Sequence, residues 1–178
     1  MTTDQFLWVL ARVAALSSYA SLALAVLTGV ALRTAVLDWL GPNRALRSLH
    51  EYTTVLWIPL AVVHVGALVL DATARVSVVD VFVPFLAPYG TLAIGLGTVS
   101  LDVLLVVAVT SLVKRRIRTD VWRWIHRAAY AAFAMVFLHA LLGGTDFGDP
   151  LVSAITWGAG ASLAMLAAVR VLWGRLPA

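Results

Sequence analysis

The sequence predicts an all-α integral membrane protein, a bundle of about five transmembrane helices. Three observations predict this class: 62% of the 178 residues are hydrophobic, only 12% are charged, and the mean hydropathy is +0.95. An average soluble domain carries about 25% charged residues, so this chain cannot cover its own apolar surface with polar groups. The composition excludes a water-soluble globule and makes the lipid bilayer the expected solvent.

The residue types that are missing exclude several kinds of site. The sequence contains no cysteine, which rules out disulfide frameworks, zinc–thiolate sites, iron–sulfur clusters and thiol nucleophiles. Any transition metal would have to be held by histidine. The pI near 10.1 does not indicate nucleic-acid binding, because the basic residues lie in short loops between apolar runs, where they orient a membrane chain.

Five apolar runs approach the roughly 20 residues that a membrane crossing requires. The first run, 13–32, predicts a helix over about 8–32, and no basic region or cleavage site precedes it, so we expect it to be retained. The second run, 52–70, predicts a helix over about 43–70 with Asn43 as its N-cap.

The remaining runs complete a single membrane domain over residues 1–178. The run 81–113 is broken only by Asp102 and is too long for one crossing. Pro84, Pro88 and Gly90 predict that 81–90 lies at the outer surface before a helix over about 91–113. The last two runs, 128–145 and 150–169, predict helices over about 120–143 and 150–173.

The basic residues predict how the chain is oriented. One set of loops holds eleven of the thirteen, and the other set holds only Arg12 and Arg75 beside five aspartates. By the positive-inside rule the first set is cytoplasmic. The N-terminus is therefore expected outside, and the fifth helix is expected to end inside, together with the C-terminus. The near-exclusive use of arginine favours a bacterial source, so we expect a multi-pass protein of the bacterial cytoplasmic membrane. The eleven residues are Arg33, Arg44, Arg47, Lys114, Arg115, Arg116, Arg118, Arg123, Arg127, Arg170 and Arg175.

All four histidines fall on two of the five predicted helices. His50 and His64 belong to the second, His126 and His139 belong to the fourth, and both helices run from inside to outside. Gaps of 14 and 13 residues span about 21 and about 19.5 Å of helix, most of a hydrocarbon core about 30 Å thick. The two pairs therefore lie at two matching depths.

Two opposing imidazoles at one depth can hold a haem between them. We therefore predict two stacked haems b, with His50 and His126 on the cytoplasmic side and His64 and His139 on the outer side. A 13-residue gap misses the starting face of a helix by about 140°, so the fourth helix either tilts, distorts or approaches the haems from different flanks. The simpler interpretation is that such histidines form hydrogen bonds between helices.

Three stretches carry a family resemblance: LHEYTTVLWIPLAVVHVGAL, TLAIGLGTVSLDVLLVVAVTS and WRWIHRAAYAAFAMVFLHALLGG. Together with the histidine spacings and the WxxxHRxxY pattern, they resemble the ferric reductase-like transmembrane domain over about residues 40 to 145. The resemblance implies that His50, His64, His126 and His139 bind b-type haems that carry electrons across the membrane. Two features differ: members commonly have six helices, and complete enzymes continue into a flavin and nicotinamide domain.

No glycine-rich dinucleotide fingerprint occurs in this sequence. We therefore expect a separate cytoplasmic flavoprotein reductase, or membrane quinol, to donate electrons that pass to an acceptor at the outer face. A second di-haem possibility is the membrane anchor of a dehydrogenase. A haem-free transporter or scaffold, with Asp102 and the histidines relaying protons, is the alternative from a different class.

Several other residues are candidates for supporting roles. Arg127 adjoins a predicted ligand and suits a haem propionate, although basic residues there also serve topology. Asp102 lies near the middle of the third helix. Three roles are open for its carboxyl group: a structural one with hydrogen bonds from Thr98 and Ser100, a hydrogen bond to a ligand histidine, or proton relay. Small residues at four positions indicate close helix contacts, namely Gly95, Gly97, Gly158 and Gly160.

Overall fold

The structure is a computed structural model that describes residues 2–33, 39 and 41–172. Six α-helices occur among these residues, which confirms the all-helical class predicted from the sequence. The chain forms two compact units, residues 1–75 with 151–178 and residues 76–150. Trp173, the predicted end of the last helix, and Arg175, one of the predicted cytoplasmic basic residues, lie outside the described residues.

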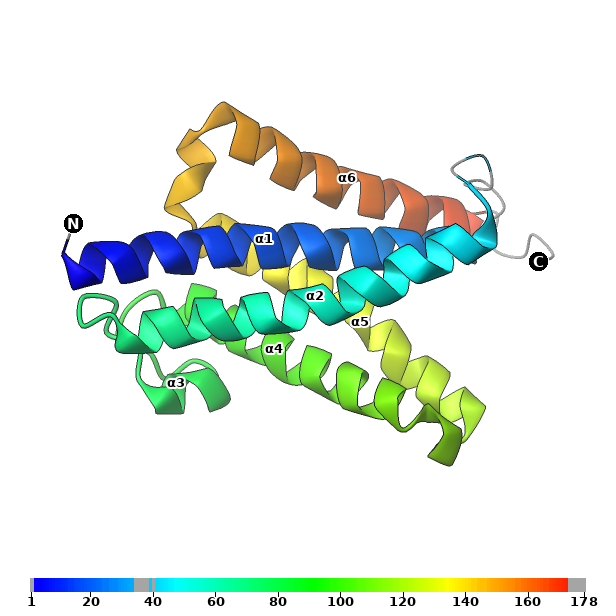
Figure 1. Ribbon diagram of the computed structural model, residues 1–178, viewed down its shortest axis with the longest axis horizontal. Helices are drawn as coiled ribbons and strands as arrows, with labels where there is room; N and C mark the ends of the chain where they lie inside the picture. The colour runs from blue at the N-terminus through cyan, green and yellow to red at the C-terminus, as the bar shows by residue number, and fades with distance from the viewer. Residues whose placement is uncertain (1, 34–38, 40, 173–178) are drawn as a thin grey trace. The chain divides into compact units, whose positions relative to one another are not determined.

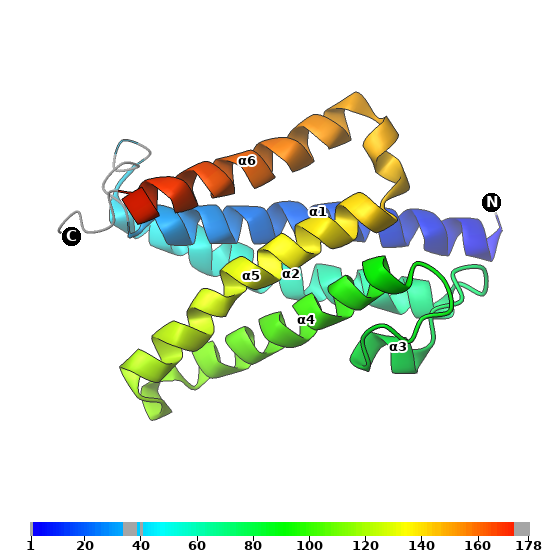
Figure 2. The same ribbon diagram turned by 180° about the vertical axis from the view of Figure 1, so that it is seen from behind.

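The first unit contains α1 (Thr3–Ala31), α2 (Asn43–Leu70) and α6 (Pro150–Leu172). α1 and α2 lie side by side and run in opposite directions (Figures 1 and 2). α1 begins before the predicted position 8 because Thr2 and Gln5 form a capping box, with Thr2 Oγ1 accepting from the Gln5 backbone N–H at 3.2 Å.

Small side chains and short polar contacts hold α1 against its neighbours. Ala11, Ala14 and Ala25 are buried on α1, which lets the helix backbones approach closely. The Ser21 hydroxyl donates to the carbonyl oxygen of Thr53 at 3.0 Å, which fixes α2 beside α1. The Tyr19 hydroxyl donates to the carbonyl oxygen of Thr156 at 3.3 Å and connects α1 to α6, while Ser18 donates to Trp57 in α2.

The start of α2 differs by one residue from the sequence prediction. Pro42 occupies the N-cap position and makes no side-chain cap, whereas Asn43 is the first helical residue, so the prediction of Asn43 as N-cap is wrong. Proline is tolerated at a helix start because its missing N–H has no intrahelical partner there. α2 then continues without interruption to Leu70 and includes Pro59.

The second unit contains α3 (Val78–Phe82), α4 (Thr91–Leu112) and α5 (Thr119–Gly143). α3 lies in and just before the segment that the sequence placed at the outer surface. A capping box accounts for the start of this short helix. The backbone N–H and the hydroxyl of Ser77 donate to the Asp80 carboxylate at 2.8 and 2.7 Å. These hydrogen bonds hold the pKa of Asp80 below its usual range.

α4 and α5 pack together as an antiparallel hairpin (Figures 1 and 2). A short 3₁₀ turn, Lys114–Arg116, separates them. The hydroxyl of Thr98 on α4 donates to the carbonyl oxygen of Asp80 at 2.8 Å, which connects α4 to α3. α5 begins at Thr119, and Arg118 at its N-cap forms an exposed ion pair with Asp120 at 2.8 Å. α5 remains α-helical throughout, so distortion does not reconcile the 13-residue histidine gap.

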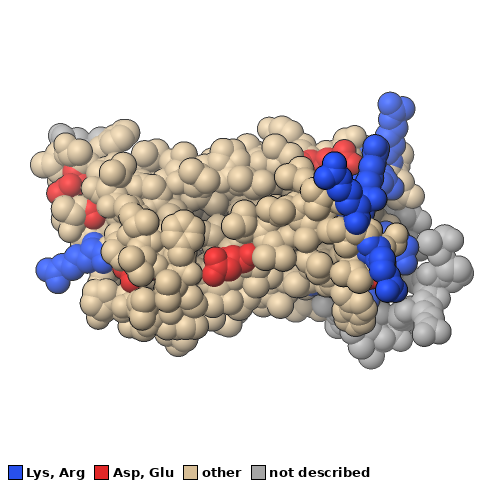
Figure 3. All heavy atoms as spheres, turned by 90° about the horizontal axis from the view of Figure 1, so that it is seen from below, with Lys and Arg blue, Asp and Glu red and all other residues tan. Residues whose placement is uncertain are grey.

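Four helices, α1, α2, α4 and α5, are each long and apolar enough to cross a membrane. The apolar stretch of α6 with described side chains, Pro150–Leu166, is shorter, so the described residues contain four such helices where the sequence predicts five. Most of the surface visible in Figure 3 is neither acidic nor basic. These features indicate a multi-pass membrane protein.

Candidate functional site

The two histidines of α2 both hydrogen-bond to the backbone of α1. Nδ1 of His50 lies 2.7 Å from the carbonyl oxygen of Ala25, and Nδ1 of His64 lies 2.9 Å from that of Ala11. The histidines are 14 residues apart and so are their acceptors. Because the helices are antiparallel, one register brings both imidazoles to α1, and both rings are half-buried there.

The same arrangement occurs once in the second unit. Nδ1 of His139 on α5 lies 2.7 Å from the carbonyl oxygen of Ala93 on α4. The ring also lies directly against Gly97, because a Cβ built there would come within 2.8 Å of Nδ1. His139 is half-buried like the histidines of α2. Three imidazoles on two helix pairs are thus held by one type of contact.

These contacts define the proton position on each of the three rings. A backbone carbonyl can only accept a hydrogen bond, so Nδ1 of His50, His64 and His139 must carry the hydrogen. In the neutral imidazole the lone pair then lies on Nε2. Metal-ligating histidines typically donate their other ring N–H to a carbonyl or carboxylate, which sets the tautomer and ring orientation. The three rings have that arrangement.

His126 is positioned by an aromatic contact. Its ring stacks on Trp122 one turn earlier in α5, with ring centroids 5.0 Å apart and planes at 24°. The Trp122 indole N–H donates to the Ser111 hydroxyl of α4 at 3.4 Å. Since α5 is regular, His126 and His139 lie on faces about 140° apart. The two histidines of α5 therefore occupy different faces of that helix.

Arg127 is exposed, and its guanidinium lies over the ring of Trp124, 5.1 Å from the centroid. A cation over an indole face is a favourable contact in its own right. The structure therefore places Arg127 at the ninth residue of α5, next to His126, with an aromatic partner that orients it.

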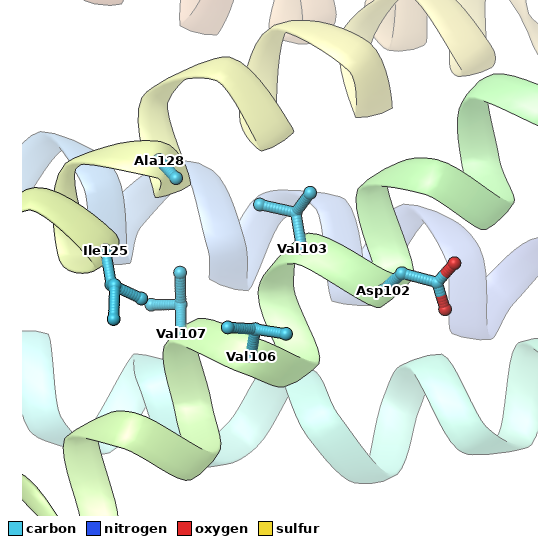
Figure 4. A pocket seen from close by; sticks show the side chains of 6 residues that line it. All are labelled: Asp102, Val103, Val106, Val107, Ile125 and Ala128. Atoms are coloured by element: carbon cyan, nitrogen blue, oxygen red, sulfur yellow. The ribbon is translucent and has the colours of Figure 1, made fainter.

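Asp102 is half-buried in the middle of α4. The hydroxyls suggested as its partners donate elsewhere: Thr98 donates to the Asp80 carbonyl oxygen and Ser100 donates to that of Gly97. Asp102 borders a hollow of about 350 Å³, and Figure 4 shows its carboxylate directed away from the other five lining side chains, which are Val103, Val106, Val107, Ile125 and Ala128.

The structure thus defines a helical protein of membrane-spanning type in which three histidines hydrogen-bond to the backbone of a neighbouring helix. The chain belongs to the family described as Domain of unknown function (DUF8596), whose model matches residues 6–146. That range includes all four histidines, Arg127 and Asp102. No curated protein and no solved structure matches the chain.

Sequence reasoning identified the histidines but missed their acceptors. A backbone carbonyl occurs at every residue, so Ala11, Ala25 and Ala93 carry no signal of this role in their side chains. The 14-residue repeat between Ala11 and Ala25, opposite the 14-residue repeat of His50 and His64, is visible only once the antiparallel register is known.

The geometry predicts the ring tautomers directly. In ¹⁵N-histidine-labelled protein, studied in lipid nanodiscs at a pH where the rings are neutral, His50, His64 and His139 should each show the Nδ1–H form. Any haem present would be kept in its reduced, diamagnetic state, and single histidine substitutions would assign the signals. An Nε2–H signature for any of the three would contradict the hydrogen bonds to Ala25, Ala11 and Ala93.

Proposed function

We propose that the chain is a transmembrane cytochrome b that holds two haems b and carries electrons from the cytoplasmic face to an acceptor at the outer face. The observation that carries the proposal is the donation of Nδ1–H from His50, His64 and His139 to carbonyl oxygens of the neighbouring helix. The proposal includes five crossings, with the N-terminus outside and the C-terminus inside, in a bacterial cytoplasmic membrane.

The donor set fits a haem. Neutral imidazole ligates haem iron through one ring nitrogen, and a hydrogen bond from the other nitrogen to a carbonyl increases the basicity of the ligand. A haem held in this way supplies one-electron redox chemistry when bound. The protein residues hold the ring planes and exclude water with their apolar neighbours.

The matched spacings support a specific pairing. With His50 and His64 14 residues apart and His126 and His139 13 residues apart, the proposed pairs are His50 with His126 and His64 with His139. The first pair belongs to the cytoplasmic depth and the second to the outer depth. In this pairing, Arg127 beside His126 is the proposed partner of a haem propionate.

Electrons are proposed to arrive at the basic segment from Lys114 to Arg127. Lys114, Arg115 and Arg116 form the exposed 3₁₀ turn between α4 and α5, and Arg123 and Arg127 are exposed on the first turns of α5. Complementary potentials attract an acidic partner to such a surface. A separate flavoprotein reductase is therefore the proposed donor, with membrane quinol as the other source.

Replacing His64 with alanine should remove the outer haem and leave the inner haem reducible. The pyridine haemochrome ratio of haem to protein would fall by about half, because only one of the two proposed ligand pairs is broken. Val63→Ala, a neighbouring change at an exposed side chain, should keep both haems. A wild-type protein without haem, or a His64→Ala protein with its full haem content, would contradict the proposal.

Neutralising Arg115 and Arg116 as glutamine should slow reduction by a soluble flavoprotein at low ionic strength. A decrease of roughly tenfold is expected from lost electrostatic attraction, and it should shrink at high salt because exposed charges are screened. Stopped-flow reduction at several salt concentrations measures it. Arg75→Gln, which removes a basic charge from the opposite predicted face, is the control. Identical rates at all ionic strengths would instead support quinol as donor.

Asp102→Asn should retain both haems and most of the transmembrane electron transfer. The residues from Val103 to Val109 offer no further titratable group, so Asp102 does not begin a proton chain along α4. Asparagine keeps the size and hydrogen-bonding capacity of aspartate without its ionisation. Haem content, redox titration and turnover in proteoliposomes measure the effect. Loss of turnover with unchanged spectra would show that the proton is required.

A further inference from the structure

Each carbonyl that accepts from an imidazole is followed, four residues later, by a small residue. Ala11 is followed by Ala15, Ala25 by Gly29 and Ala93 by Gly97. The pattern occurs on two different helices, α1 and α4, and in both compact units. It accompanies every hydrogen bond described above between a histidine and a backbone carbonyl.

Helix geometry explains why this position matters. In an α-helix the carbonyl oxygen of residue i points toward the N–H of residue i+4. An imidazole that reaches the same oxygen from a neighbouring helix must therefore lie against residue i+4. At Gly29 a Cβ would lie 3.1 Å from Cε1 of His50, and at Gly97 it would lie 2.8 Å from Nδ1 of His139.

We propose that Gly29 and Gly97 are positioning residues for the ligand histidines. Each forms, together with the carbonyl four residues earlier, a seat that holds one imidazole with Nδ1 inward and Nε2 presented for ligation. The role of the seat rests on the proposed function, because it matters chemically only if Nε2 binds a haem. Ala15 is the corresponding small residue opposite His64.

The surroundings of other glycines show that contact with a histidine is not a general feature of glycines in these helices. Gly95 lies two residues from Gly97 on α4, yet a Cβ there would collide with the ring of Phe85 rather than with a histidine. Gly66 on α2 and Gly158 on α6 have open space at the Cβ position. The histidine contact thus belongs to Gly29 and Gly97, and Gly66 supplies a matched control.

The two seats should differ in their tolerance of a methyl group. At 2.8 Å the Gly97 Cβ would overlap His139, so the ring must rotate or the helices must separate. At 3.1 Å the Gly29 Cβ would press on His50 less severely. Gly97→Ala should therefore disturb its histidine more than Gly29→Ala does, and both should act on one histidine each.

The test compares Gly97→Ala and Gly29→Ala with Gly66→Ala, where the added Cβ meets open space, in the full chain. Haem content, the midpoint potentials of the haems and the ¹⁵N tautomer signals of His139 and His50 are measured, with far-UV circular dichroism as the folding control. In Gly97→Ala we expect the Nδ1–H signal of His139 to be lost and the affinity for one haem to fall by about 10- to 100-fold. Gly29→Ala should shift the midpoint potential of the other haem, and Gly66→Ala should leave potentials and tautomers unchanged.

The outcomes distinguish a failure of the seat proposal from a failure of the proposed function. If the wild-type protein holds no haem, the proposed function fails, and the tautomer of His139 still tests the seat. If Gly97→Ala does not fold, the milder Gly29→Ala variant decides through His50. The proposal is overturned if tautomers and potentials survive both seat substitutions, or if Gly66→Ala produces the same changes as Gly97→Ala.

Discussion

An imidazole inside an apolar helix has to satisfy its N–H within the protein, and this requirement governs the arrangement of α1 with α2 and of α4 with α5. Leaving such a group without a partner away from water costs free energy comparable to a lost hydrogen bond. His50, His64 and His139 meet the requirement with carbonyl oxygens of the preceding long helix. The acceptors determine the tautomer, and the tautomer determines which nitrogen can bind a metal.

The register of α1 against α2 follows from the same contacts. Ala11 with His64, Ala25 with His50, and Ser18 with Trp57 are all pairs in one antiparallel register, and Ser21 with Thr53 lies within one residue of it. A slip of one residue would rotate the histidines by about 100° and break these contacts together. The helix pair therefore presents two imidazoles in one fixed register, and the proposed redox role needs ligands that are held in this way.

The long elements could be predicted from the sequence because membrane-length apolar runs leave few alternatives. The short helix α3 was harder to predict, because its five residues are too few for a periodic signal. The Ser77 to Asp80 spacing of its capping box is nevertheless present in the sequence. Gly97 was predicted to mark a close helix contact, and the structure shows that the contact is with His139. The carbonyl acceptors could not be predicted, since they depend on register and every residue has a carbonyl.

Ligation of two haems by the four histidines is tested most directly by electron paramagnetic resonance of the oxidised, purified protein. Two imidazoles on one ferric iron produce a low-spin signal whose shape depends on the angle between the ring planes. We predict two distinct low-spin signals, because His126 is oriented by stacking on Trp122 while His139 is oriented by the carbonyl of Ala93. A haem-loaded protein with only high-spin iron, or a folded protein with no iron signal, would contradict bis-histidine ligation.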